Sequence, residues 1–366
     1  MSSVFSSTSV RQQCAATQRQ LLGSLPKKLQ NLARFGLSAF VRTPFVSCNA
    51  NARMATTQRS AAEMRMYRLL RHVRLASLLL EAVQRALPLD SRSVLNVDFS
   101  NFGSVAVLVA ALQTRHGRAL PWVLEALVSN TQGIHAGKPG HARHKAAYQA
   151  WKHEAGGDQY DVVLRLVAGI DQQAAAPPAL VFDRGFGNKR LLTALFARQG
   201  KSYIRMCDDF RLGVVTPGGF LDTWRVSELP PGDYRVRWLG LSFRLVVVTT
   251  RRQAENLAPW AIATNDQAST PQQIAKLYYY RFEIEETFRD WKSGLGLRRA
   301  HLHRWQSLQV LLSFASVATL LAWQAATNAT PHRQPHPKKQ LSFFRQWQEQ
   351  LQQYVCWRRP TALAGG

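Results

Sequence analysis

The chain has 366 residues, of which 47 are Lys or Arg and 22 are Asp or Glu, so its formal net charge is +25. Hydrophobic residues make up 46% of the sequence, which is enough for a packed core and excludes a chain that is disordered throughout. A folded protein with so one-sided a charge fits a polyanionic partner, because each cation placed on a phosphate releases bound counterions. We expect nucleic acid as the first partner class and an anionic membrane surface as the second.

Neither the cysteines nor the hydrophobic segments indicate a secreted or a membrane protein. The four cysteines are far apart and form no CxxC pair, so neither a zinc ribbon nor a dense disulfide framework is expected. The most hydrophobic stretch, Leu308 to Trp323, is interrupted by polar residues and is shorter than the roughly 20 apolar residues of a membrane-spanning helix. We interpret it as a buried helix and expect no membrane partner.

Residues 1–92 are predicted to form a basic arm and a helical DNA-binding domain. The sequence up to about residue 55 is basic and lacks periodicity, and the first acidic residue is Glu63. Such a composition also occurs in organelle transit peptides, and a later start at Met54 is a further alternative. From Ala61 to Leu87 apolar residues recur at helical spacing, which predicts a helix.

Residues 93–207 are predicted to form the first part of an α/β core. It should begin with three strands in an antiparallel meander, at Val94–Phe99, Val105–Leu112 and Ala119–Leu127. A long helical region should follow at His141–Asp171, interrupted by glycines. The first strand ends on the carboxylate of Asp98. A short buried strand, Ala179 to Phe182, then delivers Asp183 to its carboxyl end, where α/β enzymes place reactive groups. A helix and a fifth strand should follow, at Asn188–Arg198 and Ser202–Met206.

Residues 208–258 depart from this alternation and are predicted to be a β-rich insertion. Within it, Trp224 is a candidate for stacking on a flipped base, a role that aromatic side chains commonly serve. Trp238 lies in an alternating strand on the face opposite Arg235 and Arg237, so core packing explains it at least as well. Residues 259–327 should complete the core, and residues 328–366 form a basic tail.

The helix that begins at Thr270 has three independent start signals: Thr270 as N-cap, Pro271 at the first helical position and Gln273 three residues after the cap. It is predicted to run to about Ser293. Four polar residues on it fall within an arc of roughly 60° at 100° per residue, namely Tyr278, Arg281, Glu285 and Lys292. This row suits a groove that grips an extended anion, although a row of this kind also fits a solvated face. The basic track is predicted to continue at Arg298 and Arg299.

Three carboxylates on separate elements make a metal-dependent phosphoryl transfer the most specific chemical hypothesis. Asp98, Asp183 and Glu285 together could hold two Mg2+ or Mn2+ ions for in-line displacement at phosphorus. A lone Asp at a strand end also serves as a turn former or helix cap. His141 and His144 lie one helical turn apart but have no Cys or carboxylate at ligand spacing, so a solvated or phosphate-facing pair explains them better than a metal site.

The row on the Thr270 helix resembles a known signature. The spacing Tyr278-x2-Arg281-x3-Glu285-x6-Lys292 is similar to that of the DDE transposases of bacterial insertion sequences, specifically the insertion-sequence-four family. The segment Val181–Phe186 is similar to the surroundings of that family's second acid. Asp98-Phe99-Ser100 is similar to those of its first acid, with Ser where Thr is usual. The similarity covers roughly residues 64–323.

The resemblance implies a ribonuclease H-like mixed sheet flanked by helices, with a β-rich insertion and a helical N-terminal domain. It implies that Asp98, Asp183 and Glu285 bind a pair of Mg2+ ions, with Mn2+ as a possible substitute. It further implies that Arg281 and Lys292 contact phosphates near the transposon end, and that Tyr278 positions the end or an extruded base.

The function implied by this resemblance is DNA cleavage at insertion-sequence ends followed by strand transfer into target DNA, a cut-and-paste transposition. Its partners would be double-stranded DNA with terminal inverted repeats, target DNA and a second copy of the chain, at the nucleoid in a bacterial cytoplasm. Two alternatives remain: a catalytically inactive DNA-binding relic or repressor, and a ribonuclease H-like nuclease that cleaves without strand transfer. An RNA-binding organelle protein is disfavoured by the absence of RNP and KH patterns.

Overall fold

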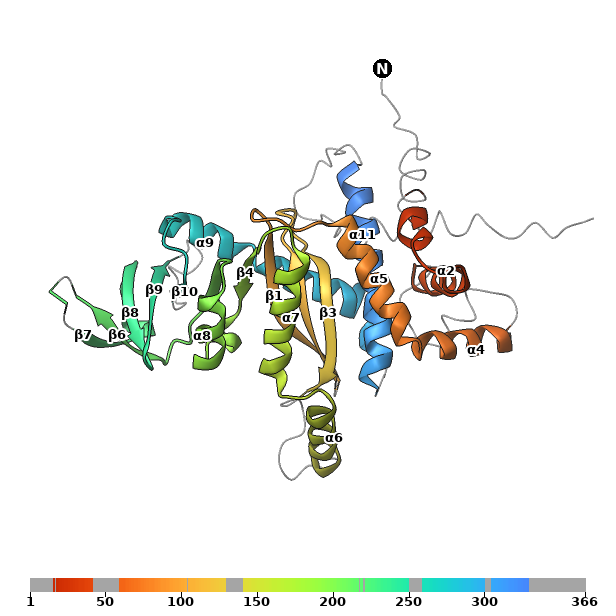
Figure 1. Cartoon of the computed structure of the whole chain (residues 1–366), viewed down its shortest axis with the longest axis horizontal. Coiled ribbons are helices and arrows are strands. Elements are labelled where there is room, and N and C mark those ends of the chain that lie inside the picture. Colours follow the sequence, from red (N-terminus) through yellow and green to blue (C-terminus); the bar gives the residue numbers. More distant parts are fainter. Residues whose placement is uncertain are drawn as a thin grey trace, which may run out of the picture.

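A mixed sheet of ten strands forms the centre of the protein in the computed structural model, which describes residues 16, 18–41, 59–103, 105–129, 141–216, 218, 219, 221–249, 259–299 and 304–328. The strand order is β3-β2-β1-β4-β5-β10-β9-β8-β6-β7. Helices lie against both faces of its central part (Figure 1). The structure thus confirms the predicted mixed α/β architecture with a large sheet between helices.

The strands follow the predicted order and extend the sheet further than expected. They are β1 (Val94–Phe102), β2 (Val105–Leu112), β3 (Leu120–Val128), β4 (Ala179–Phe182), β5 (Ser202–Arg205), β6 (Arg211–Val215), β7 (Leu221–Arg225), β8 (Gly232–Trp238), β9 (Leu241–Val248) and β10 (Trp260–Thr264). Strands β1 to β3 form the predicted antiparallel meander, and β1, β4 and β5 are parallel. The strands of residues 208–258 are not a separate sheet, because β9 pairs with β10 and β10 pairs with β5.

The helices with described bounds surround this sheet. They are α2 (Lys27–Val41), α4 (Arg59–Leu70), α5 (Val73–Ala86), α6 (His141–Glu154), α7 (Gln159–Gln173), α8 (Lys189–Ala197), α9 (Pro271–Tyr279), α10 (Phe282–Arg289) and α11 (Trp305–Asn328). The predicted interruption between α6 and α7 is confirmed. Gly156 has a φ of 64°, a backbone conformation that glycine adopts readily, and Asp158 then caps α7 through a capping box.

The N-terminal region differs from its prediction in two ways. Residues 61–87 form two helices, α4 and α5, because the chain turns at Arg71 and His72 and the His72 side chain accepts a hydrogen bond from the Leu75 N–H. Residues 27–41, expected to be loosely structured, form α2. Its Gly36 lies so close to Leu69 and Phe314 that an added Cβ would meet the Phe314 ring. Helix α2 is therefore stabilised by packing against α4 and α11, and no local sequence pattern predicts this contact.

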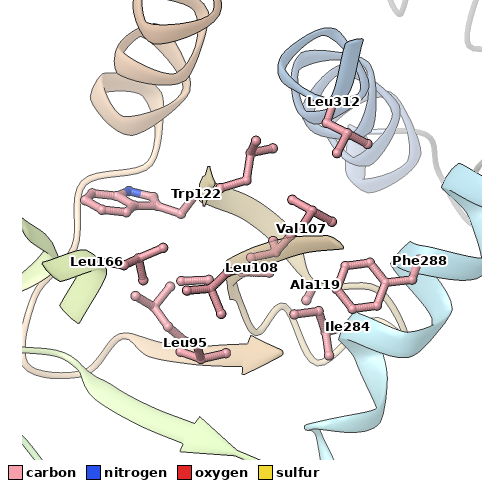
Figure 2. Close-up of a cluster of buried hydrophobic side chains, with 14 of the residues drawn as sticks. Leu95, Val107, Leu108, Ala119, Trp122, Leu166, Ile284, Phe288 and Leu312 are labelled. Atoms are coloured by element: carbon pink, nitrogen blue, oxygen red, sulfur yellow. The ribbon is translucent and has the colours of Figure 1, made fainter. Parts of the chain in front are cut away.

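The hydrophobic core has two layers, one on each side of the sheet. Figure 2 shows Leu166 of α7 beside Leu95 and Leu108, and Ile284 and Phe288 of α10 on the other side of the strands. Helix α11 is long and apolar enough, over residues 305–324, to cross a membrane. Most of it is buried against α5 and β3 instead, which confirms the predicted buried helix and accounts for its apolar sequence.

The helix that begins at Thr270 was predicted to be continuous, but it breaks once. Thr270 caps α9 through a capping box with Gln273, as expected. The chain then turns at Tyr280 and Arg281 before α10 begins, and a π-helical turn follows at residues 290–294. The break has a packing reason, since Ile274 and Tyr278 of α9 belong to one hydrophobic cluster and the core residues of α10 to another.

Candidate active site

The register of the parallel strands brings Asp98 and Asp183 together. The last residue pair between β1 and β4 is Val97 with Phe182, so the two aspartates are the next residues along neighbouring strands. Asp183 follows β4 as predicted. Asp98, expected at a strand end, lies inside β1, because the other edge of β1 continues its pairing with β2. The prediction of its position in the strand was wrong, but Asp98 does lie where the parallel pairing ends.

The loop after Asp183 is held against β1 by stacked aromatic rings. Phe186 stacks on Phe99 with their centroids 5.3 Å apart, and it also contacts Phe182. Phe186 is buried, so this packing fixes the short helical turn that follows Asp183. Asp98 is thereby held in a strand and Asp183 at the start of a turn that packs against it.

Arg281 lies between the carboxylates of Asp98 and Glu285. Its Nη1 is 3.4 Å from Asp98 Oδ2, and its Nη2 pairs with Glu285 Oε1. The guanidinium also lies 5.9 Å from the centre of the Tyr278 ring. Three of the four polar residues predicted on one helix face are therefore in contact, although the helix is broken between the first and the second.

The break between α9 and α10 is held by two polar side chains that sequence reasoning missed. Asn96, which is fully buried, donates from Nδ2 to the Tyr280 carbonyl at 3.0 Å. Gln113 Nε2 donates to Asn96 Oδ1 at 2.7 Å and to the Leu277 carbonyl at 3.3 Å. The available signal was an Asn in an apolar strand two residues before Asp98, because alternate residues share a sheet face.

The electrostatics of the site are dominated by the burial of Asp98. Burial raises the pKa of the Asp98 carboxyl to about 7, against the lowering effect of Arg281. The negative charges of Asp183 and Glu285 raise this pKa further, so the three carboxylates are electrostatic neighbours. Burial also lowers the pKa of Lys292, as does the nearby charge of Arg298, while Asp98 opposes this shift.

The remaining predicted site residues are placed as follows. Lys292 Nζ lies 5.5 Å from the centre of the Phe102 ring, on the strand that carries Asp98. Arg298 is exposed, and the side chain of Arg299 lies outside the described part. Trp224 is 39% exposed on β7, at the far edge of the sheet from β1, so the structure does not bring it together with the three acids.

The other side chains considered in the sequence have ordinary explanations. His144 Nε2 lies 2.7 Å from the Ser129 carbonyl oxygen, a hydrogen bond that accounts for it without a metal, and the His141 side chain lies outside the described residues. Trp238 stacks on Phe210 with centroids 5.0 Å apart and packs against the core, as predicted. Of the four cysteines, Cys207 is described, and it is free.

The carboxylates fit a divalent metal by chemistry but not by their present arrangement. Asp98, Asp183 and Glu285 offer the oxygen donors that Mg2+ and Mn2+ prefer. Within the described residues, however, no group of three or more His, Cys, Asp or Glu side chains is arranged to hold a metal ion. The reason lies in the contacts above, because two of the three carboxylates pair with Arg281.

Two buried polar atoms beside these carboxylates have no hydrogen-bond partner among the described residues. They are the Tyr278 hydroxyl and Nε of Arg205, a residue that sequence reasoning missed at the end of β5. The two are electrostatic neighbours, since the charge of Arg205 acts on the Tyr278 hydroxyl. Unpaired buried polar groups are rare in folded proteins and suit a site whose partner is a ligand.

The comparison with known families bears directly on this arrangement. Residues 150–321 match the family model described as the transposase DDE domain. The match supports a DDE transposase. It contains Asp183 and the whole of α9 and α10, whereas Asp98 precedes it. No curated protein matches the chain.

The DDE domain match agrees with the fold, with the net charge and with the chemistry of the grouped carboxylates. A ten-stranded mixed sheet flanked by helices is consistent with the ribonuclease H-like fold of a transposase. A transposase acts on DNA and typically uses divalent metal ions, which suits both the net charge of +25 and the grouped carboxylates.

Proposed function

We propose that the chain is a cut-and-paste transposase of the insertion-sequence-four family, which cleaves DNA at insertion-sequence ends and joins those ends to target DNA. The observation that carries this proposal is the juxtaposition of Asp98, Asp183 and Glu285 around Arg281, in a sheet whose strands β4 to β10 lie within the match to a transposase DDE domain. The four-residue spacing from Tyr278 to Lys292 supports the narrower family.

In this proposal Asp98, Asp183 and Glu285 would hold two Mg2+ ions, or Mn2+ in their place. When bound, such ions supply Lewis-acid stabilisation for in-line displacement at phosphorus. Because Arg281 pairs with two of these carboxylates in the protein alone, metal binding requires it to turn away. A DNA phosphate is the natural new partner for this guanidinium, since charge-assisted bonds to phosphate are strong and bidentate.

The other side chains of the site have proposed roles in holding DNA. Lys292 and Arg298 would contact phosphates near the transposon end, with Arg299 beyond them. Tyr278, whose buried hydroxyl has no described partner, would position the end or an extruded base, and Arg205 would assist it. Trp224 remains a proposed stacking residue, which would have to act on DNA at the far edge of the sheet.

Two ends must be held together for transposition, so the proposed working form is a homodimer bound to two terminal inverted repeats and then to target DNA. Such a protein would act at the nucleoid in a bacterial cytoplasm. The domain limits 1–92, 93–207, 208–258, 259–327 and 328–366 are part of this proposal. Residues 1–92 would bind DNA and residues 208–258 form the insertion.

One observation favours a second candidate, a DNA-binding protein without catalysis. Within the described residues no metal group of three carboxylates is formed, and Arg281 pairs with two of the acids. A repressor derived from a transposase would need the cations but not the metal. The two candidates therefore differ in whether the acids matter once DNA is bound.

The deciding experiment measures cleavage and joining of DNA that carries the gene's flanking inverted repeats, with Mg2+ or Mn2+, at equal DNA occupancy. We expect wild type to cleave and join, and Glu285→Gln to bind but do neither. Glu154→Gln is the matched control, because Glu154 is an exposed carboxylate at the end of α6. Cleavage without joining would indicate a nuclease, and binding without cleavage by wild type would indicate the repressor. Equal cleavage by wild type and Glu285→Gln would overturn the assignment of Glu285.

A further inference from the structure

Four arginines share one face of the sheet in the region of residues 208–258. Arg211 of β6 is directly opposite Arg225 of β7. Arg237 of β8 is opposite Gly213 of β6, and because Gly213 has no side chain, nothing at that position separates Arg237 from the other two arginines. Arg235 lies two residues before Arg237 and therefore points to the same side. All four side chains are exposed. We call these four residues the arginine face.

The positive charge of the arginine face is only weakly compensated within the described part of the chain. Within the described residues none of its four members forms an ion pair, and the Glu228 carboxylate, which lies beside Arg225, accepts a hydrogen bond from the backbone N–H of Arg225. Asp233, an acid on the same face of β8, is already bound by Arg244 through two bonds of 2.6 and 2.9 Å. Like charges directly opposite each other on neighbouring strands destabilise a sheet. The pair of Arg211 and Arg225 thus disfavours the free protein, which points to a polyanionic partner that neutralises it.

The arginine face lies on the same side of the sheet as Asp98. Residue pairs connect the two across the sheet, because partners in register point to the same side. The connection runs from Asn96 through Val181, Tyr203, Thr264 and Arg244 to Arg235. Asn96 is two residues before Asp98 and shares its face. A polyanion bound at the carboxylates can therefore continue along this side of the sheet to the arginines.

Helix α9 covers this side of the sheet only as far as β9. Its residues Ile274 and Tyr278 pack on Val181, Tyr203, Ile262 and Val246, which belong to β4, β5, β10 and β9. The strands beyond, β8, β6 and β7, form one end of the molecule, and no labelled helix lies over them in Figure 1. The arginine face is where this side of the sheet becomes open to solvent.

The distance from the carboxylates sets where along a DNA duplex these arginines would bind. Strand β8 is five positions from β1 in the sheet and β7 is seven. With neighbouring strands about 4.8 Å apart, the arginine face lies roughly 24 to 34 Å from Asp98 as measured along the sheet. One base pair advances the duplex by about 3.4 Å, so this span corresponds to about 7 to 10 base pairs.

We propose that the arginine face binds the sugar–phosphate backbone of the transposon-end duplex, about 7 to 10 base pairs inside the phosphodiester that is cut. This inference rests on the proposed function for the identity of the DNA. The end duplex is favoured over flanking DNA because the flank leaves after cleavage, whereas the end must stay bound until it is joined. Backbone contacts of this kind position a duplex without reading its sequence.

The experiment uses a double variant in which Arg211 and Arg225 are both replaced by Gln. Its control is a second double variant in which Lys145 and Lys152 are both replaced by Gln. The control residues are exposed cations of α6 without a described ion pair, so both variants lose the same charge. Binding of an end duplex is measured over a series of salt concentrations. We expect the arginine variant to lower the slope of log affinity against log salt by about 2, and the control to leave it unchanged.

The position of the contacts is tested by phosphate ethylation interference on the same duplex. With wild type, ethylation about 7 to 10 base pairs inside the cut should weaken binding, and the arginine variant should lose this interference. Interference on the flanking side instead, or an unchanged pattern in the variant, would overturn the proposal. An equal salt slope for the arginine variant and wild type would overturn it as well.

A charge reversal separates binding from a structural role. Arg225→Glu places a carboxylate opposite Arg211, so the thermal unfolding midpoint of the free protein should stay the same or rise while end binding weakens. A lower midpoint with unchanged binding would mean that the pair is structural. Cleavage assays distinguish the two proposals. If wild type cleaves DNA but the arginine variants bind it normally, only the proposal for the arginine face is contradicted. If wild type shows the salt and interference effects but does not cleave DNA, only the proposed transposase function is contradicted.

Discussion

Arg281 lies 3.4 Å from Asp98 through its Nη1, across 183 positions of sequence, and it pairs with Glu285 on its own helix as well. A guanidinium between two carboxylates supplies the positive charge that a divalent cation would otherwise supply. In the protein without metal, this single positive charge therefore offsets part of the negative charge of the two carboxylates. In the proposed transposase, release of Arg281 links the binding of DNA to the binding of metal.

The first prediction concerns this link. Arg281→Gln should bind Mn2+ several-fold more tightly than wild type in the absence of DNA, because the carboxylates of Asp98 and Glu285 lose their competing partner. Cleavage should nevertheless fall, since the contact of Arg281 to phosphate is lost. Calorimetry or the electron paramagnetic resonance of free Mn2+ measures the affinity.

The control for this experiment is Arg289→Gln, since Arg289 is exposed and pairs with Glu286 on the same helix. Its Mn2+ affinity should match that of wild type. Weaker or equal Mn2+ binding by Arg281→Gln would show that the guanidinium does not compete with the metal.

The second prediction follows from the pKa of Asp98, which burial raises to about 7 from an ordinary value of 3.8. The folded state then holds this proton more tightly than the unfolded state. Its contribution to stability is complete below about pH 4 and is lost as the pH rises through about 7. The metal-free protein should therefore lose stability between about pH 4 and pH 7. Asp98→Asn should reduce that loss in denaturant titrations, and an identical pH dependence would contradict the assignment.

The third prediction concerns Glu283, which ties the turn between β2 and β3 to α10. Its buried carboxylate accepts hydrogen bonds from the N–H groups of Thr114 and Gly117, each at 2.9 Å. Glu283→Ala removes the acceptor of both donors and breaks this link to α10, so the free energy of unfolding should fall by about 2 kcal/mol. Glu154→Ala, on an exposed surface, should change it by less than about 0.5 kcal/mol. A loss no larger than that of the control would refute the role of Glu283.

The fourth prediction concerns Asn96 and Gln113, which hold the break between α9 and α10. Asn96→Ala removes the donor to the Tyr280 carbonyl and the acceptor for Gln113. Cleavage at saturating DNA should fall by at least about tenfold, because a displacement of catalytic groups near 1 Å is costly. DNA affinity should change little. The variant is measured well below its unfolding midpoint, and an unchanged cleavage rate would contradict the positioning role.

The fifth prediction concerns the Tyr278 hydroxyl. Because this buried group has no described partner, Tyr278→Phe should leave the free protein equally stable or more stable, by up to about 1 kcal/mol. The same change should weaken binding of the transposon end. A loss of stability together with normal DNA binding would show that the hydroxyl has a partner in the protein instead of in the DNA.

Local sequence signals predicted much of the fold. The capping residues at Thr270, the glycines before α7 and the apolar runs of β1 to β5 determined where most elements begin and end. These signals act within a few residues, so they can be read without knowing the tertiary structure. The same runs also placed Asp183 directly after its strand.

The prediction failed where distant packing overrides a local pattern. A continuous periodicity from Thr270 to Ser293 did not show that α9 and α10 pack in different clusters, so the break at Tyr280 and Arg281 was missed. Helix α2 was missed for the same reason, since its burial depends on α11, almost 300 positions away in the sequence.

The sequence by itself determined the chemistry of this protein: three carboxylates, a row of cations at fixed spacing and a charge of +25 that calls for a polyanion. Only the tertiary structure decided how these groups meet. It placed Arg281 between Asp98 and Glu285, and it put four arginines on the side of the sheet that carries Asp98. It also left the Tyr278 hydroxyl without a hydrogen-bond partner among the described residues. The physical reason is that strand order and register arise from pairing between residues far apart in the chain, which no local spacing encodes.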